Sequence, residues 1–430
     1  MKYQVNFKSV VNHVLFFSFF LFSCSSTRFP NDGPVDVPED CFGIVHSSEY
    51  GIMDEMGAVW TLRTFSWGAI EKEKGHFNFS GYDEYVEEAR NAGKKVGATL
   101  GYSNDWLYPE GKGKRYISPE NIPHFLDFIE EIVKHYKGKI DVWNVWNEPN
   151  IKRFWDGPDK DFFELSRRTA QKIRETDPDA YIIGGSYVRV PKRYIKKMHK
   201  AGGMNCFDGL AFHPYARNPQ GAMRLYDKLE KIMSDINFKG PVWITEIGHP
   251  TGGLYPHKTT LEKFPTYVVK ELCGVAARGA RVTLWYQLFD RYNEGEVPPS
   301  KFTLMESEKY FGLLYPNHKR KDGANAYALC GKFLPGSRYT PDYLQREKIP
   351  SSIVSVCFLE GKSGNNTLVL WNDRNRAKKA TLYLDAPAML YDISTGEGRP
   401  LSAAATLEIG AKPLMITWQG TAVPRLSTKK

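Results

Sequence analysis

Eight short apolar stretches that alternate with helix-like segments constrain the fold of this chain more than any other feature. They are CFGIVH, AVWTLRTF, KKVGATLGY, IDVWNVWNE, AYIIGGSYV, GLAFHPY, PVWITEIG and ARVTLWYQLF. Between the third and fourth, Ile122, Phe125, Ile129 and Val133 recur at a spacing of three or four residues, which predicts a helix with one apolar face. Near-continuous apolar strands separated by amphipathic helices are typical of a parallel sheet covered by helices, and eight such units predict a (β/α)8 TIM barrel of the α/β class over residues 39–338.

The pattern changes after about residue 340. SSIVSVCFL, NTLVLWND, KATLYLD, AMLYDIS, ATLEIG and PLMITWQ are short strand-like runs, separated by turns that are rich in Gly, Asn and Pro. Because no helical pattern lies between them, we expect a small antiparallel β-sandwich over residues 346–420, as an accessory domain.

The first residues have the pattern of a targeting segment. Lys2 and Lys8 precede the apolar run VLFFSFFLF, which is too short to span a bilayer comfortably. The run ends at Leu21–Cys24, which resembles a bacterial lipoprotein cleavage box with Cys24 as the lipidated residue. We therefore expect a signal peptide over residues 1–23, a polar tether over 24–38 and an extracytoplasmic, membrane-anchored lipoprotein. The alternative is an ordinary secreted or periplasmic protein.

Charge and cysteine content exclude several classes of function. Lys and Arg total 58 against 49 Asp and Glu, a net charge of +9, which indicates a solvated basic surface or an acidic polymer or anionic membrane nearby. No basic-aromatic nucleic-acid motif is present. Without Cys24, five scattered cysteines remain and none has CxxC spacing, so we expect neither a disulfide framework nor a metal site, and no cofactor. The motifs GxSxG and HExxH, typical of esterases and metallohydrolases, are also missing.

Polar residues stand at the ends of otherwise apolar strands, where the chemistry of such barrels takes place. Arg63 lies near the end of the second strand, Asn147 and Glu148 end the fourth, and Glu246 ends the seventh. A single Glu at a strand end is usually a helix cap or an ion-pair partner. Here two glutamates each end a strand that contains Trp, which favours a pair of carboxyl groups facing one pocket. Such a pair can hydrolyse a glycosidic bond.

The stretches WNVWNEPN and WITEIGHP resemble the signatures of the clan A retaining glycoside hydrolases. WNEPNIKRFW, DPDAYIIGGS, FHPY, TEIG and YFGLLY are most similar to glycoside hydrolase family 39 and its relatives. This resemblance implies a retaining β-glycosidase that hydrolyses O-glycosidic bonds in an oligo- or polysaccharide by double displacement. Its substrate would be a carbohydrate, either neutral or acidic. Its two carboxyl groups should lie about 5–5.5 Å apart.

The resemblance also implies roles for single residues. Glu148 resembles the acid/base, which its apolar strand would help keep protonated. Glu246 resembles the nucleophile, held ionised by Arg63 or Tyr215. Asn147 resembles the donor to the sugar 2-hydroxyl, although strict strand alternation would point it away from Glu148 unless the strand ends in an irregular turn.

Four further residues are candidates for substrate binding. His213 resembles the histidine of the sixth-strand motif, and Trp285 resembles the strand-eight platform on which a sugar ring stacks. Trp155 would extend the groove, and His46 is a candidate contact after the first strand. Each also has a purely structural interpretation, as a hydrogen-bonded core histidine or a packed tryptophan. The competing function is a surface glycan-binding lipoprotein built on a catalytically inactive barrel.

Overall fold

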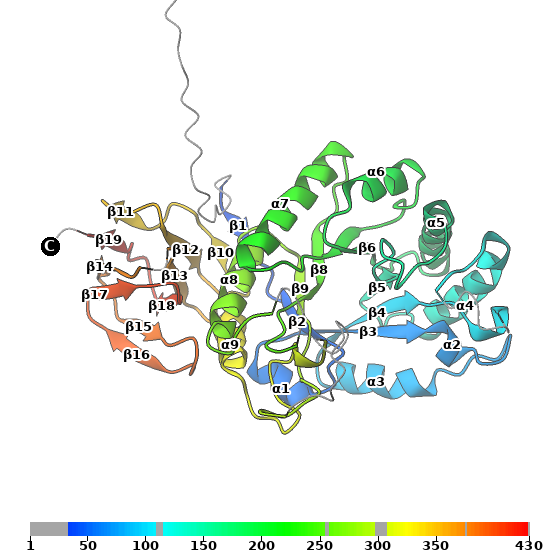
Figure 1. Cartoon of the computed structure of the whole chain (residues 1–430), viewed down its shortest axis with the longest axis horizontal. Helices are drawn as coiled ribbons and strands as arrows, with labels where there is room; N and C mark the ends of the chain where they lie inside the picture. The colour runs from blue at the N-terminus through cyan, green and yellow to red at the C-terminus, as the bar shows by residue number, and fades with distance from the viewer. Residues whose placement is uncertain (1–32, 109–114, 254–257, 297–307, 375, 429–430) are drawn as a thin grey trace, which may run out of the picture.

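A computed structural model describes residues 33–428, except for residues 109–114, 254–257, 297–307 and 375. Eight parallel strands close into a barrel in chain order (Figure 1). They are β2 (Phe42–Val45), β3 (Trp60–Ser66), β4 (Lys95–Gly101), β5 (Val142–Val145), β6 (Ile182–Val188), β7 (Gly209–His213), β8 (Val242–Ile247) and β9 (Val282–Trp285). The eight stretches predicted as strands supply these eight strands, and the predicted (β/α)8 barrel is confirmed.

Helices surround the barrel. They are α1 (Tyr50–Glu55), α2 (Trp67–Ile70), α3 (Ser80–Asn91), α4 (Ile122–His135), α5 (Asp159–Thr176), α6 (Lys192–Lys200), α7 (Pro219–Asp235), α8 (Phe264–Ala276) and α9 (Asp322–Phe333), with the short 3₁₀ turns η1 (Asp105–Leu107) and η2 (Pro119–Asn121). The start of α7 shows how the sequence sets such a boundary. The Asn218 side chain accepts a hydrogen bond from the Gly221 amide, and Pro219 occupies the first turn, where its missing N–H is not needed.

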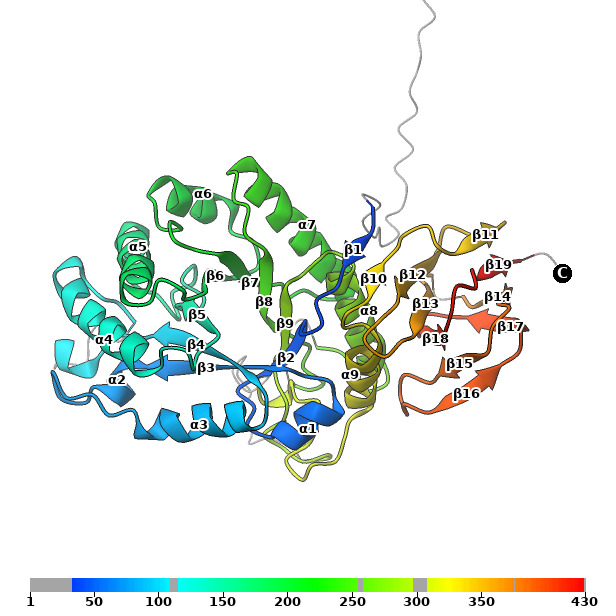
Figure 2. The same cartoon turned by 180° about the vertical axis from the view of Figure 1, so that it is seen from behind.

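The C-terminal strands form two sheets beside α8 and α9 (Figure 2). The order in the larger sheet is β1 (Val35–Asp36), β10 (Arg338–Tyr339), β12 (Ile353–Leu359), β13 (Asn366–Asn372), β18 (Leu414–Trp418), β15 (Ala388–Tyr391) and β16 (Gly398–Leu401). In the smaller sheet the order is β11 (Gln345–Glu347), β19 (Arg425–Ser427), β14 (Lys378–Tyr383) and β17 (Ala404–Ile409). The predicted sandwich is therefore present, with more strands than expected.

The ends of the chain contribute to this sandwich in a way that the predicted boundaries miss. Val35 and Asp36, which we assigned to the tether, pair with β10 as the edge of the larger sheet. Arg425–Ser427, beyond the predicted end at residue 420, pairs with β11 and β14. Both strands are only two or three residues long, too short for a periodic pattern in the sequence to reveal them.

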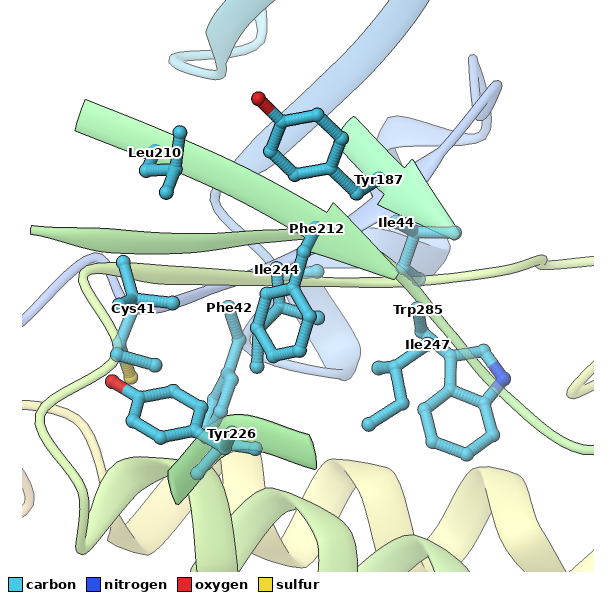
Figure 3. Packing of buried hydrophobic residues seen from close by; sticks show 14 of the residues in the cluster. Cys41, Phe42, Ile44, Tyr187, Leu210, Phe212, Tyr226, Ile244, Ile247 and Trp285 are labelled. Carbon is cyan, nitrogen blue, oxygen red and sulfur yellow. The ribbon is translucent and has the colours of Figure 1, made fainter. Parts of the chain in front are cut away.

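Two apolar layers hold the barrel together. Its interior contains Trp60, Leu62, Trp243 and Leu284. Its outer surface packs under the helices, where Figure 3 shows residues such as Phe42, Phe212 and Ile244. The same outer cluster continues into the larger C-terminal sheet through residues such as Trp371 and Phe358, so the two domains share one apolar core.

No helix in the described part of the chain is long and apolar enough to cross a membrane. The predicted signal peptide and Cys24 lie outside the described residues.

Candidate active site

A cavity of about 380 Å³ opens at the carboxyl ends of the barrel strands. The cavity is lined by five residues that we predicted from the sequence, His46, Asn147, Glu148, Tyr215 and Glu246. The remaining described lining residues are Val45, Leu62, Thr64, Thr99, Tyr102, Ile151, Arg153, Phe154, Val188, Tyr286, Glu308 and Phe311. The structure therefore brings residues that are far apart in the sequence, from Val45 to Phe311, to one site.

An irregular turn after β5 lets two consecutive residues face this cavity. The backbone leaves the strand at Trp146, with φ of 70°, and Glu148 is also left-handed, with φ of 47°. The Glu148 amide donates to the Ser186 carbonyl at 3.1 Å. Asn150 braces the turn against β6, because its side chain bonds both the amide and the carbonyl of Val188. The turn that we required for Asn147 and Glu148 to act together is present.

A second irregularity, in β8, serves Glu246. The pairing of β8 with β9 shifts register between Ile244 and Ile247. Trp243 faces the barrel interior and Ile244 packs on the outer surface, so strict alternation would point Glu246 outward with Ile244. The shift instead leaves both Thr245 and Glu246 on the inside, where Thr245 contacts His213 and Glu246 lines the cavity.

The two glutamates and His213 form one compact group. Their nearest ligand atoms, one from each residue, all lie within 4.8 Å of one another. His213 Nδ1 lies 2.7 Å from Glu148 Oε1 and 3.6 Å from Glu246 Oε2. The Tyr215 hydroxyl donates to Glu246 Oε2 at 2.9 Å. His213 is fully buried beneath the cavity, so it supports the glutamates and does not line the cavity itself.

Burial and charge oppose one another in this group. Burial raises the pKa of Glu246 to about 7, a shift that the nearby Glu148 carboxylate increases and that His213 and the Tyr215 hydrogen bond reduce. Burial by itself would lower the pKa of His213, but the Glu246 and Glu148 carboxylates outweigh it and the pKa is raised. Glu246 is thus placed to exchange a proton near neutral pH.

A histidine beside two carboxylates is also a set of atoms that a divalent cation uses elsewhere. Here those atoms are already matched to one another. His213 Nδ1 is bonded to Glu148, and Glu246 accepts from Tyr215. These contacts make the group a better candidate for proton transfer than for metal binding.

Three predicted contacts lie elsewhere. Arg63 is exposed on the outer face of β3, where its guanidinium stacks on Tyr82 and Tyr85 of α3, because its neighbours Leu62 and Thr64 take the inward positions. The stabilising role proposed for Arg63 or Tyr215 therefore falls to Tyr215 alone.

Two tryptophans proposed as sugar contacts are core residues instead. Trp285 is fully buried on the outer surface of β9, beside Ile247 (Figure 3), and packs against Phe264 and Tyr327. Trp155 is buried against Trp146, and neither tryptophan lines the cavity. In both cases the side chain points to the helix layer.

Several cavity residues were not anticipated. Tyr286 follows Trp285 directly and takes the inward position that we had given to its neighbour. Tyr102 ends the third predicted strand and hydrogen-bonds Asn147, a signal present in the sequence that we did not use. Arg153 and Glu308 form an ion pair beside the cavity, and this pair joins loops 155 positions apart, which no local pattern reveals.

Comparison of the sequence with known proteins points to one group of enzymes. The model of glycosyl hydrolase family 10 matches residues 46–180. A protein named endo-1,4-beta-xylanase A from Thermotoga neapolitana is 30% identical over 167 residues, which are 33% of this chain but 16% of that protein. A beta-1,4-xylanase from Dictyoglomus thermophilum is also 30% identical, over 32% of this chain and 42% of its own length. The chain thus aligns with less than half of each of these two relatives.

Solved structures extend the likeness to both domains. A family 39 glycoside hydrolase from Bacteroides cellulosilyticus superposes with a TM-score of 0.72 at 18% identity, over 89% of this chain and 81% of that one. A family 39 beta-xylosidase from Caulobacter crescentus gives a TM-score of 0.64 at 18% identity, over 91% and 98%. At such identities the superpositions establish the fold. Together with the family 10 match, they show that this chain is similar to the clan A glycoside hydrolases, as its two glutamate motifs indicated, with family 39 among its structural neighbours.

Proposed function

We propose that this protein is a retaining β-glycosidase in which Glu148 is the acid/base and Glu246 is the nucleophile. The observation that carries the proposal is the close approach of the two carboxyl groups at the barrel mouth, with oxygen atoms within 4.8 Å. Retaining enzymes hold their two carboxyl groups about 5–5.5 Å apart, whereas inverting enzymes leave about 6.5–9.5 Å for a water molecule. A closest approach of this size favours the shorter, retaining spacing.

In the first step, the Glu246 carboxylate attacks the anomeric carbon while Glu148 gives its proton to the glycosidic oxygen, which leaves with the aglycone. Tyr215 donates to the same Glu246 oxygen that His213 approaches, and both interactions favour the ionised form that attack requires.

In the second step, Glu148 is a carboxylate and removes a proton from water, which attacks the anomeric carbon and releases Glu246. Asn147 lines the cavity next to Glu148, in a position suited to a sugar hydroxyl, and Tyr102 holds its side chain. The site therefore contains a group for each proton that the double displacement moves.

The cavity favours a neutral sugar over an acidic one. Arg153 is the only Lys or Arg among the described lining residues, and its guanidinium is already paired with Glu308. The Glu246 carboxylate adds a negative charge that would repel a uronate. The named activities of the relatives suggest β-linked xylosides as the first substrates to test. An accessible cavity that contains both glutamates supports an enzyme over the alternative of an inactive glycan-binding barrel.

We also propose that the protein works outside the cytoplasm, attached to a membrane through a lipid on Cys24. The support is the sequence pattern of residues 1–24.

Two variants separate the roles of the glutamates. Glu246→Ala removes the attacking group, so even a dinitrophenyl β-xyloside should not react. Glu148→Ala should still form the glycosyl-enzyme on that activated substrate and then stall, because no base remains, while natural glycosides are not cleaved. Added azide should restore turnover of Glu148→Ala and give the β-glycosyl azide.

Glu84→Ala, on the exposed face of α3, is the matched control and should behave as the parent. An α-azide from Glu148→Ala, or full activity of Glu246→Ala, would overturn the assignment. If the parent cleaves no β-glycoside but binds a glycan, the binding function replaces the enzymatic one.

A further inference from the structure

A continuous chain of buried polar side chains lies inside the barrel below the two glutamates. Five neighbouring strands, β4 to β8, contribute one residue each. These residues are Thr99, Asn144, Ser186, His213 and Thr245, and none is more than 4% exposed. So many buried polar groups in one layer are expensive unless each finds a partner. Hydrogen bonds connect all five side chains into one network.

Ser186 enters this layer because β6 is irregular. Gly185 has φ of +98°, and the pairing with β7 shifts register between Gly184 and Tyr187. The bulge leaves Ser186 with φ of 38° and directs its hydroxyl group to Asn144 on one side and Thr245 on the other. The GGS sequence of β6 thus places Ser186 at the centre of the hydrogen-bonded row.

The number of protons available along this row of side chains fixes the donor and the acceptor in each hydrogen bond. The Asn144 amide nitrogen donates to Thr99 Oγ1 at 3.0 Å, so the amide oxygen of Asn144 faces Ser186 and can only accept. Ser186 therefore uses its one proton on Asn144, at 3.0 Å. The contact between Ser186 and Thr245, at 3.2 Å, then needs the proton of Thr245.

The last link is His213. With its proton directed to Ser186, Thr245 Oγ1 can only accept from His213 Nε2, which lies 3.1 Å away. Nε2 must therefore carry a proton. In the opposite neutral tautomer Thr245 would turn its proton to Nε2, and two buried hydroxyl oxygens 3.2 Å apart would have no proton between them.

We infer that Asn144, Ser186 and Thr245 are positioning residues that keep the proton on Nε2 of His213, so that His213 exchanges its proton only at Nδ1, the atom that faces Glu148. This inference rests on the proposed function, because it assigns His213 to the acid/base of that reaction. His213 Nδ1 and Glu148 Oε1, 2.7 Å apart, then share a single proton in the resting enzyme. The proton is carried either by the carboxyl group or by the imidazolium.

This arrangement serves both steps of the reaction. In the first step the shared proton leaves through Glu148 to the glycosidic oxygen. The Glu148 carboxylate is then left facing an Nδ1 that has no hydrogen to donate, which favours its taking a proton from water in the second step. The charged and titratable groups that face His213 are Glu148 from the β5–α5 loop, Glu246 from β8 and Tyr215 after β7, with Tyr102, Tyr286 and the Arg153–Glu308 pair further out around the cavity.

Nitrogen NMR of the imidazole rings tests the inference without any substrate. The chain has ten histidines, so the His213 signals are assigned by their loss in His213→Gln. Across a pH titration, Nε2 should keep the chemical shift of a protonated nitrogen while Nδ1 alone changes. A neutral His213 that carries its proton on Nδ1 would overturn the inference, whether or not the enzyme is active.

Kinetics of Thr245→Val test the consequence. Valine has nearly the same shape but cannot accept from Nε2, so the proton moves to Nδ1 and bonds the Glu148 carboxylate, favouring its ionised form. The basic limb of the kcat/KM profile should then move down by about one pH unit, and substrates with poor leaving groups should lose the most activity. Thr245→Ser keeps the hydroxyl group and should restore the parent profile.

Thr169→Val is the matched control, because the Thr169 hydroxyl in α5 is buried and has no hydrogen-bond partner among the described residues. It should leave the profile unchanged. An unmoved basic limb in folded Thr245→Val would overturn the inference, and if that variant does not fold, the NMR titration of the parent chain decides. Failure of the parent on every glycoside would instead refute the proposed function and leave the tautomer measurement standing.

Discussion

Replacing Tyr215 by Phe removes one hydrogen bond to the proposed nucleophile and little else. The hydroxyl group donates to Glu246 Oε2 at 2.9 Å, and Phe keeps the ring that packs edge-on against Phe311. Because the bond stabilises the ionised carboxylate, its loss should raise the pKa of Glu246 further above its present value of about 7. Glu246 must be ionised to attack, so activity is lost as the pH falls through this pKa, and the variant should lose it at a higher pH.

The magnitude follows from the kind of bond. A hydrogen bond to a charged group contributes about 1.5–3 kcal/mol, and 1.36 kcal/mol corresponds to one pKa unit. The acid limb of kcat/KM should therefore move up by about one to two pH units. At pH 7 this corresponds to a loss of roughly five- to fifty-fold in kcat/KM. The difference between parent and variant should become smaller as the pH rises, because Glu246 of the variant then ionises as well.

The assay is the pH dependence of kcat/KM on an aryl β-xyloside for the parent and the variant. Tyr187→Phe is the matched control, because its hydroxyl group is buried on the outer side of the barrel and contacts Met198. It should leave the acid limb in place. An equal loss of activity at every pH in Tyr215→Phe would show that the hydroxyl group acts on substrate binding and not on the ionisation of Glu246.

Three further predictions concern stability and location. Asp40 is partly buried, which raises its pKa, but its hydrogen bonds to Arg281 and Lys95 outweigh this and lower the pKa to about 2, so Asp40→Asn should cost about 2 kcal/mol in unfolding free energy at neutral pH. A carboxyl group whose pKa is lowered by folding stabilises the fold at pH values above its pKa in the unfolded chain. The difference in unfolding free energy between parent and Asp40→Asn should therefore shrink between pH 4 and pH 2 in denaturant titrations. Trp285→Ala should destabilise the fold by about 3–5 kcal/mol in the same titrations, while KM of the folded enzyme stays near that of the parent; a large rise in KM would restore Trp285 as a sugar platform. Cys24→Ala should release the protein from the membrane fraction, and unchanged fractionation on immunoblots would argue against the lipid anchor.

Local patterns in the sequence were enough to predict the barrel and the identity of its two glutamates. Strand and helix periods are set by residues a few positions apart, so eight apolar strands could be recognised one at a time. Glu148 and Glu246 stood out because each ends an apolar strand that contains tryptophan, where an ionisable group needs a reason to be present. The ion pair of Asp290 and Lys321, in which both side chains are buried, gave no such signal.

The direction in which each side chain points was decided by the tertiary structure. Strand alternation predicts which way a side chain points only if the strand is regular. Near the site, β6 and β8 shift register against their neighbours, and the chain after β5 turns through residues with positive φ. The shift in β8 places Glu246 inside the barrel, and the turn after β5 lets both Asn147 and Glu148 face the cavity. In the regular parts of β3 and β9, alternation itself sends Arg63 and Trp285 outward. Bulges depend on pairing with a neighbouring strand that is distant in sequence, so the amino-acid sequence alone could point to the two glutamates but could not say which residues face them.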